Sequence, residues 1–174
     1  MKPQDILVLL KICAMSGKRW NIGSVAKSIA MSASEVHSAI KRLEKSDLLR
    51  KEGKSPYARS PNIASVEEFL AHGVKFAFPA ETGGKTRGVP TAHSAPPLST
   101  LIVADDDDAL VWPHESGTAR GQGVTPLYSS VPLAVRDDPD LHALLALVDG
   151  IRIGRTRERE LAVTELSRLL RPFQ

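Results

Sequence analysis

Two helices separated by very few residues constrain the fold of this chain more than any other feature of its sequence. Ser32-Ala33-Ser34-Glu35 has the pattern of a capping box, in which each end residue accepts a hydrogen bond from the other's backbone amide. Apolar residues then recur at helical spacing to about residue 46. A shorter helix over residues 22–30, with Asn21 as its N-cap, comes just before. The short connection predicts a sharp turn between the two helices.

The rest of residues 1–60 complete a compact motif around this helix pair. Apolar spacing predicts an amphipathic helix over residues 4–15. Residues 48–53 predict a short strand entering a turn, and residues 54–59 a returning strand, which Pro56 restricts to a sheet edge. Helix, helix, tight turn, helix, strand and strand is the order of a winged helix-turn-helix. We therefore expect a mainly α protein with a small β wing, in the α+β class.

The third helix has two faces of different chemistry. At about 100° per residue, its apolar side chains share one side: Val36, Ala39, Ile40 and Leu43. The opposite side carries small hydroxyls near its start and cations further along, with His37 and Arg42 on the flanks. Such a face fits the major groove of B-form DNA, which is about 12 Å wide. The alternative is a helix face that only contacts water.

Candidate DNA-binding residues follow from this face and from the strand hairpin after it. Ser34, His37 and Ser38 lie near the leading end, so we expect them to reach base edges, and we expect the cations to contact phosphates. The leading outward positions hold no Arg, Asn or Gln, so shape readout, wing contacts and subunit pairing would supply specificity. The full set is Ser32, Ser34, His37, Ser38, Lys41, Arg42, Lys45, Arg50, Lys51, Lys54 and Arg59.

Charge is distributed unevenly along the chain. Residues 1–60 hold twelve Lys and Arg against five Asp and Glu, whereas residues 61–174 are net acidic. A basic first part on an acidic body indicates that only the first part meets a polyanion. The apolar runs are too short for a membrane span or a signal peptide, and the single cysteine, Cys13, lies in an apolar helical pattern. We expect a cytoplasmic protein in which Cys13 is a buried core residue.

Residues 3–59 resemble the winged-helix domains of MarR-type and related bacterial regulators. The resemblance is carried by NIGSVAKSIAMSASEVHSAIKRLEKSDLLRKEG, and it departs from the pattern at Ala30, where the turn often has Gly. We expect Ala30 to keep a right-handed backbone. The remainder is similar to small uncharacterised bacterial proteins that join such a domain to a GVPTA…APPL…VWP…PLY segment and a helical tail. The resemblance implies a cytoplasmic regulator and brings no catalytic residues.

The rest of the chain divides into three parts. Residues 61–75 predict a connecting helix that ends at Gly73 in a left-handed cap. Residues 76–136 hold most of the twelve prolines and predict an extended segment with three short apolar stretches, 74–78, 101–103 and 110–112, as possible strands. Asp105 to Asp108 would form a solvated loop. Residues 137–174 predict a helical hairpin, broken at Gly154, for dimerisation or partner binding.

Other patterns are weak. Pro79 to Thr86 ends like a phosphate-binding loop, but Pro79 replaces the first glycine, and Gly88 and Pro90 prevent the helix that must follow. The five histidines lack metal-ligand spacing, and no residue set has the arrangement of a catalytic triad. We expect no cofactor, no metal and no enzyme activity.

Three functions fit these observations. The first is a sequence-specific, homodimeric DNA-binding transcriptional regulator, acting as a repressor. The second is an antitoxin or defence-system accessory protein that binds a partner protein through residues 76–174 and represses its own operon. The third is a ligand-sensing regulator with a pocket lined by Trp112 and Tyr128.

Overall fold

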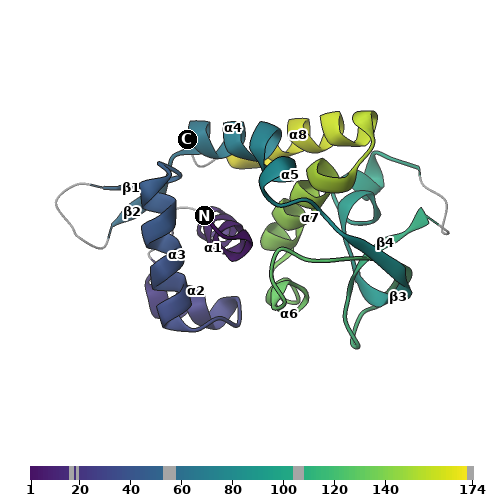
Figure 1. Cartoon of the computed structure of the whole chain (residues 1–174), viewed down its shortest axis with the longest axis horizontal. Helices are drawn as coiled ribbons and strands as arrows, with labels where there is room; N and C mark the ends of the chain where they lie inside the picture. Colours follow the sequence, from purple (N-terminus) through teal and green to yellow (C-terminus); the bar gives the residue numbers. More distant parts are fainter. Residues whose placement is uncertain (16–17, 19, 53–57, 104–107, 172–174) are drawn as a thin grey trace.

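Helices dominate the computed structural model, which describes residues 1–15, 18, 20–52, 58–103 and 108–171, and two small sheets complete an α+β fold. Figure 1 shows α3 and the β1–β2 hairpin at one end of the molecule and strands β3 to β5 at the other. Helix α7 lies between the two ends. The fold class expected from the sequence is therefore confirmed at the level of helices with small sheets.

The first part of the chain has the predicted order of elements. These are α1 (Pro3–Ala14), α2 (Ile22–Ser28), α3 (Ala33–Lys45), β1 (Leu49–Lys51) and β2 (Arg59–Pro61). Both predicted caps are present: the Asn21 side chain accepts from the Ser24 amide, and Ser32 and Glu35 form the capping box. Of the second strand predicted over 54–59, residues 54–57 lie outside the described residues, and Arg59 belongs to β2. The strand runs on to Pro61, and the Asn62 amide donates to the Leu48 carbonyl, which continues the antiparallel ladder.

The turn between α2 and α3 corrects one prediction. Ala30 has φ of 51°, a left-handed backbone, where a right-handed one was expected. The Met31 amide donates to the Ala26 carbonyl and the Ala30 amide to the Lys27 carbonyl, which is the Schellman pattern of helix ends. This pattern needs a left-handed residue after the cap, so the turn fixes the conformation of Ala30 despite its Cβ.

The predicted connecting helix is longer than expected. Helix α4 (Ile63–Glu68) continues through a π-helical turn (Phe69–Gly73) into α5 (Val74–Ala77). Gly73 has φ of −103°, so it is not a left-handed cap, and residues 74–78 are not a strand. The reason is packing: Val66, Leu70 and Val74 are all buried at four-residue spacing, which holds one apolar stripe against the core.

Residues 76–136 are not the extended segment that the prolines predicted. They form β3 (Thr82–Pro90), two 3₁₀ turns (Ala92–Ser94 and Leu98–Thr100), β4 (Leu110–Pro113), β5 (Ala119–Val124) and the short helix α6 (Val131–Ala134). The stretch at 110–112 is the predicted strand, whereas 101–103 is irregular chain after a 3₁₀ turn. Of the acidic run, Asp105 to Asp107 lie outside the described residues, and Asp108 is exposed.

The three strands close on one another. Strand β3 pairs antiparallel with both β4 and β5, and β4 pairs parallel with β5. So tight a closure requires residues without side chains at the contacts. A Cβ on Gly88 would lie 2.1 Å from the Trp112 carbonyl oxygen, and one on Gly121 would lie 2.3 Å from that of Ala109. These glycines obscure the alternating pattern by which strands are recognised in a sequence.

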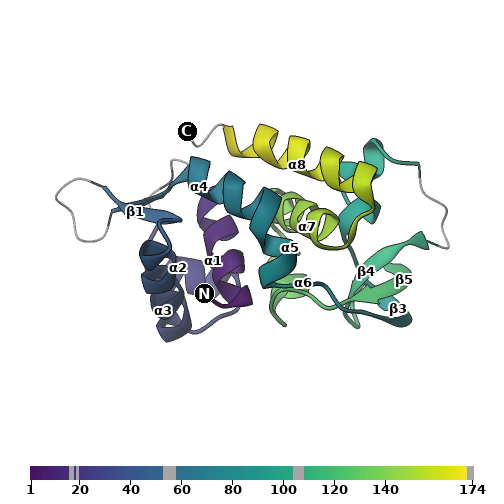
Figure 2. The same cartoon turned by 45° about the horizontal axis from the view of Figure 1, so that its top comes forward.

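The predicted C-terminal hairpin is present as α7 (Pro139–Ile153) and α8 (Thr156–Leu170), broken at Gly154. Helix α7 contacts α1, α5 and α8, and α8 lies across it in Figure 2. The exposed residues of α8 are polar: Thr156, Arg157, Glu160, Thr164 and Arg168. Within the described part of α8 the exposed side chains are therefore polar, and the use of the hairpin for dimerisation or partner binding stays a prediction.

One hydrophobic core joins the first and last parts of the chain. It includes Leu7 and Leu10 of α1, Leu43 of α3 and Leu145 and Val148 of α7, all at most 2% exposed. A polar network adds to it on the other side of α7. The buried Asp149 carboxylate accepts from Trp112 Nε1 at 2.6 Å and from Thr91 Oγ1 at 2.9 Å, and it pairs with Arg152. These contacts hold α7 against β3 and β4.

We predict that Ala30→Gly does not destabilise the protein. Removing a left-handed Cβ relieves about 1–2 kcal/mol, and the freedom that Gly adds to the unfolded chain offsets about 0.4–1 kcal/mol. The free energy of unfolding, measured in urea, should stay level or rise by about 1 kcal/mol. Ala143→Gly, within α7, is the control and should cost at least about 0.5 kcal/mol. Equal losses in both variants would contradict this account of the turn.

Candidate nucleic-acid interface

Helix α3 lies at one end of the molecule with its outward side open to solvent. Figure 1 places α1 on its inner side, and the β1–β2 hairpin extends from the C-terminal end of the helix. Val36, Ala39, Ile40 and Leu43 are buried, as the sequence predicted. Ser34, His37, Lys41 and Lys45 are exposed, and Ser38 is half-buried. The two faces predicted from sequence therefore exist as predicted.

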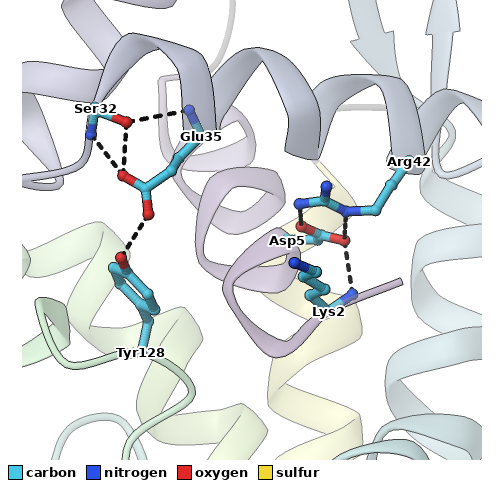
Figure 3. A network of polar contacts seen from close by, with 6 residues as sticks. All are labelled: Lys2, Asp5, Ser32, Glu35, Arg42 and Tyr128. Carbon is cyan, nitrogen blue, oxygen red and sulfur yellow. Dashed lines mark hydrogen bonds and ion pairs between the residues drawn. The ribbon is translucent and has the colours of Figure 1, made fainter.

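A polar network fixes the N-terminal end of α3 to the C-terminal half of the chain (Figure 3). Glu35 Oε2 accepts from the Ser32 amide at 3.1 Å and from the Ser32 hydroxyl at 2.7 Å. Its other oxygen, Oε1, accepts from the Tyr128 phenol at 2.7 Å. Nearby, the Ser130 hydroxyl donates to the Ile29 carbonyl at 2.6 Å. The segment before α6 thus contacts both sides of the α2–α3 turn.

These hydrogen bonds stabilise the ionised form of Glu35. The Ser32 hydroxyl, then the Tyr128 phenol and the Ser32 amide, hold the pKa of the Glu35 carboxyl below its ordinary value. The same contact raises the pKa of Tyr128, because its phenol donates to a carboxylate. At neutral pH the Glu35 carboxylate is therefore ionised and accepts hydrogen bonds from the neutral Ser32 and Tyr128 hydroxyls. Ser32, predicted as a DNA contact, has its hydroxyl engaged here.

A second contact fixes α3 to α1, and it involves a predicted phosphate ligand. Arg42 donates to the fully buried Asp5 carboxylate through Nε at 2.8 Å and Nη2 at 2.6 Å (Figure 3). The Lys2 amide donates to the same carboxylate at 2.8 Å. Hydrogen bonding to Asp5 raises the pKa of the Arg42 guanidinium. The guanidinium therefore points inward, and its placement favours a structural role over phosphate binding.

Of the cationic side chains predicted as DNA contacts in and next to the β1–β2 hairpin, some form ion pairs, as Arg42 does, and others are exposed. Arg50 forms a two-bond pair with Asp47, at 3.0 and 2.8 Å, and Arg59 pairs with Glu44 of α3. Lys51 is exposed on β1. Lys54 lies outside the described residues. The pair between Arg59 and Glu44 fixes the β1–β2 hairpin beside the last turn of α3.

These contacts leave a defined set of exposed side chains, which we call the serine–lysine face: Ser34, His37, Lys41 and Lys45. Neither lysine of this face makes an ion pair with any residue that the structure describes. The arginines around it are paired with Asp5, Asp47 and Glu44. Lys41 and Lys45 therefore place exposed positive charge on the outward side of α3, while the neighbouring arginines are held in ion pairs.

Other candidate residues have structural positions. Gly83 to Thr86, which resembles part of a phosphate-binding loop, belongs to strand β3, and the strand continues to Pro90 where a phosphate-binding loop would begin a helix. Trp112 is 1% exposed and bonded to Asp149, so it does not line an open pocket with Tyr128. Burial raises the pKa of the Cys13 thiol to about 12, which makes it unreactive.

The described residues lack the features of two other classes of site. Within that part of the chain, no group of three or more His, Cys, Asp and Glu side chains is arranged to hold a metal ion. Its helices also include none with the length and apolar character needed to cross a membrane.

Sequence reasoning missed the partners that orient α3. The sequence shows Asp5 only as an acidic residue in the first turn of a helix. Tyr128 lies 93 residues from Glu35. No local pattern connects residues so far apart. The available signal for Asp5 was its place directly before the apolar run Ile6 to Leu10, because a carboxylate that becomes buried with such a run requires a cationic partner.

Comparisons with protein-family models, with curated proteins and with solved structures gave no match for this chain. The resemblance of residues 3–59 to MarR-type regulators is therefore a prediction carried by the residues quoted above. The function has to be argued from the geometry of the chain itself.

We predict that Ser32→Ala raises the pKa of Glu35 toward its ordinary value, and that Tyr128→Phe raises it by a smaller amount. The order follows because Ser32 is the larger cause of the depressed pKa. A depressed pKa stabilises the fold at neutral pH, and that contribution is lost as the pH falls through the folded-state value. NMR titration of the Glu35 side-chain carbon measures both shifts. Ser34→Ala is the control, and an equal shift in it would contradict the assignment.

Proposed function

We propose that this protein is a transcriptional regulator that binds duplex DNA through a winged helix-turn-helix formed by α1, α2, α3 and the β1–β2 hairpin. The observation that carries the proposal is the serine–lysine face, whose Lys41 and Lys45 are exposed and have no acidic partner among the described residues. Helix α3 would enter the major groove, and the hairpin would meet the adjacent backbone.

The division of charge around α3 supports this role. The Arg42 and Arg59 pairs hold the helix against α1 and the hairpin, so they fix its orientation before any ligand binds. A preorganised helix loses little conformational freedom on binding. Lys41, Lys45 and Lys51 then supply phosphate contacts, which set register and affinity.

Sequence preference would come from the leading end of the same face. Ser34 and His37 are exposed near the N-terminus of α3, where recognition helices contact base edges. Their side chains are short or planar, so each would contact one or two base edges. We propose a repressor as the form of this function, because a protein bound over a promoter excludes other proteins from it.

We predict that Lys41→Ala and Lys45→Ala each weaken binding to all duplex sequences and reduce the salt slope by about one unit, since each lysine neutralises about one phosphate. Fluorescence anisotropy of a labelled random-sequence duplex, titrated at several salt concentrations, measures both effects. Lys75→Ala, on α5 away from α3, is the control and should leave affinity and slope unchanged. Binding by both α3 variants equal to the unmodified protein at every salt concentration would refute the role of this face.

We predict that Ser34→Ala and His37→Ala change which sequences the protein selects, while affinity for random duplex stays within about twofold. Selection from a random duplex library, followed by sequencing, gives the preferred site of each protein. Loss of either side chain should relax the base preference at one or two positions of the site only. Unchanged preferences in both variants, alongside weaker binding by Lys41→Ala, would indicate that base readout lies elsewhere than the leading end of α3.

A further inference from the structure

Two arginines face each other across the small sheet at the end of the molecule opposite α3. Arg87 of β3 and Arg120 of β5 are register partners in the antiparallel pair, and both are exposed. Residues directly opposite in such a pair have Cβ atoms about 4.5–5.5 Å apart and project from the same face. Lys85 and Gln122 are the next register pair on that face, and both are exposed. The four side chains form a row that we call the sheet arginine row.

The fold fixes this arrangement. The alternate residues of the two strands, Gly88 and Gly121, are buried against Trp112 and Ala109 with no space for a Cβ. A shift of register by one residue would force arginine side chains into those contacts. Arg87 and Arg120 are therefore held on the outer face whether or not a ligand is present.

No acidic side chain neutralises these two arginines within the described part of the chain. The ion pairs of that part involve other residues, and like charges directly opposite each other destabilise a sheet. By contrast, Arg42 and Arg152 each have a carboxylate partner. An anion between Arg87 and Arg120 would remove the repulsion, and guanidinium groups bind phosphate oxygens through paired N–H donors.

We propose that Arg87 and Arg120 bind the phosphate backbone of a second DNA duplex, so that one molecule of the protein bridges two duplex segments. The duplex as ligand rests on the proposed function of α3. It departs from the expectation that only residues 1–60 meet a polyanion, because the net acidic charge of residues 61–174 does not neutralise this local pair of arginines. The site lies at the opposite end of the molecule from α3 (Figure 1), so a straight duplex on α3 does not reach it. The row is entirely polar, which suits a phosphate backbone better than a protein partner, whose interface would have an apolar centre.

The backbone next to the row is accessible to a large ligand. Gly83 and Gly84 are exposed, and a Cβ on either would have no atom within 4 Å. The β3 backbone that precedes Arg87 is therefore not covered by side chains of other elements.

A bridging assay with the full chain tests the proposal. Beads carry one immobilised duplex, the protein is added, and capture of a second, fluorescently labelled duplex is measured. We expect capture by the unmodified protein and a loss of at least about tenfold in Arg87→Gln/Arg120→Gln, with affinity for single duplexes through α3 kept within about threefold. The matched control, Arg136→Gln/Arg157→Gln, replaces two exposed arginines on other elements and should capture normally. Circular dichroism checks that each variant is folded.

The outcomes separate this proposal from the function of α3. In Lys41→Ala/Lys45→Ala we expect loss of bridging with residual binding of one duplex through the sheet. No capture by the unmodified protein, or normal capture by Arg87→Gln/Arg120→Gln, would overturn the bridging proposal and leave the α3 proposal intact. Normal binding and capture by the α3 variant would overturn the α3 proposal instead. If poly-glutamate binds in an Arg87- and Arg120-dependent way and no second duplex is captured, the partner is an acidic protein and the proposal is wrong.

Discussion

The orientation of α3 depends on one buried ion pair. Asp5 has no contact with solvent, and an ionised carboxylate in that position requires a charged partner, which Arg42 supplies through two short hydrogen bonds. Because Asp5 belongs to α1, and α1 packs on α7, the pair connects the outward helix to the centre of the molecule. It also removes one arginine from the surface. The exposed face of α3 therefore carries fewer cationic side chains than the sequence predicted, because Arg42 is not part of it.

The two halves of the chain act as one body. Core side chains of α1, α3 and α7 belong to a single cluster. The hydrogen bonds of Asp149 hold α7 to β4 and to the end of β3. Tyr128, in the segment before α6, donates a hydrogen bond to Glu35 at the start of α3. Burial raises the pKa of the Asp149 carboxyl, while Arg152, Trp112 and Thr91 all favour its ionised form. The small sheet and α3 are therefore connected through packed side chains of α7, and the start of α3 is also connected to the segment before α6 through Tyr128.

Local patterns predicted the first part of the chain and the last. Caps, apolar spacing and a helix-breaking glycine are short-range features, and α1, α2, α3, α7 and α8 follow them closely. The prediction for residues 76–136 was wrong for a physical reason. Closure of β3, β4 and β5 depends on buried glycines such as Gly88 and Gly121, which do not show the alternation typical of strands, and the prolines of this segment indicated irregular chain. The outward face of α3 was predictable from periodicity. The pairing of Arg42 with Asp5 and of Glu35 with Tyr128 was not, because each joins residues far apart in sequence.

The closed pairing of β3, β4 and β5 has a consequence for how the protein behaves in concentrated solution. An open sheet ends in strands whose unpaired amides and carbonyls can recruit another chain, and this is a common route to aggregation. Here each of the three strands has the other two as partners, with β3 paired to β5 between Thr82 and Gly88 and to β4 between Gly88 and Pro90, so closure shortens the open edge of the sheet. The closure depends on glycine at its tightest contact: a methyl group at Gly88 would lie 2.1 Å from the Trp112 carbonyl oxygen, so it would separate β3 from β4 and expose backbone groups that are now paired.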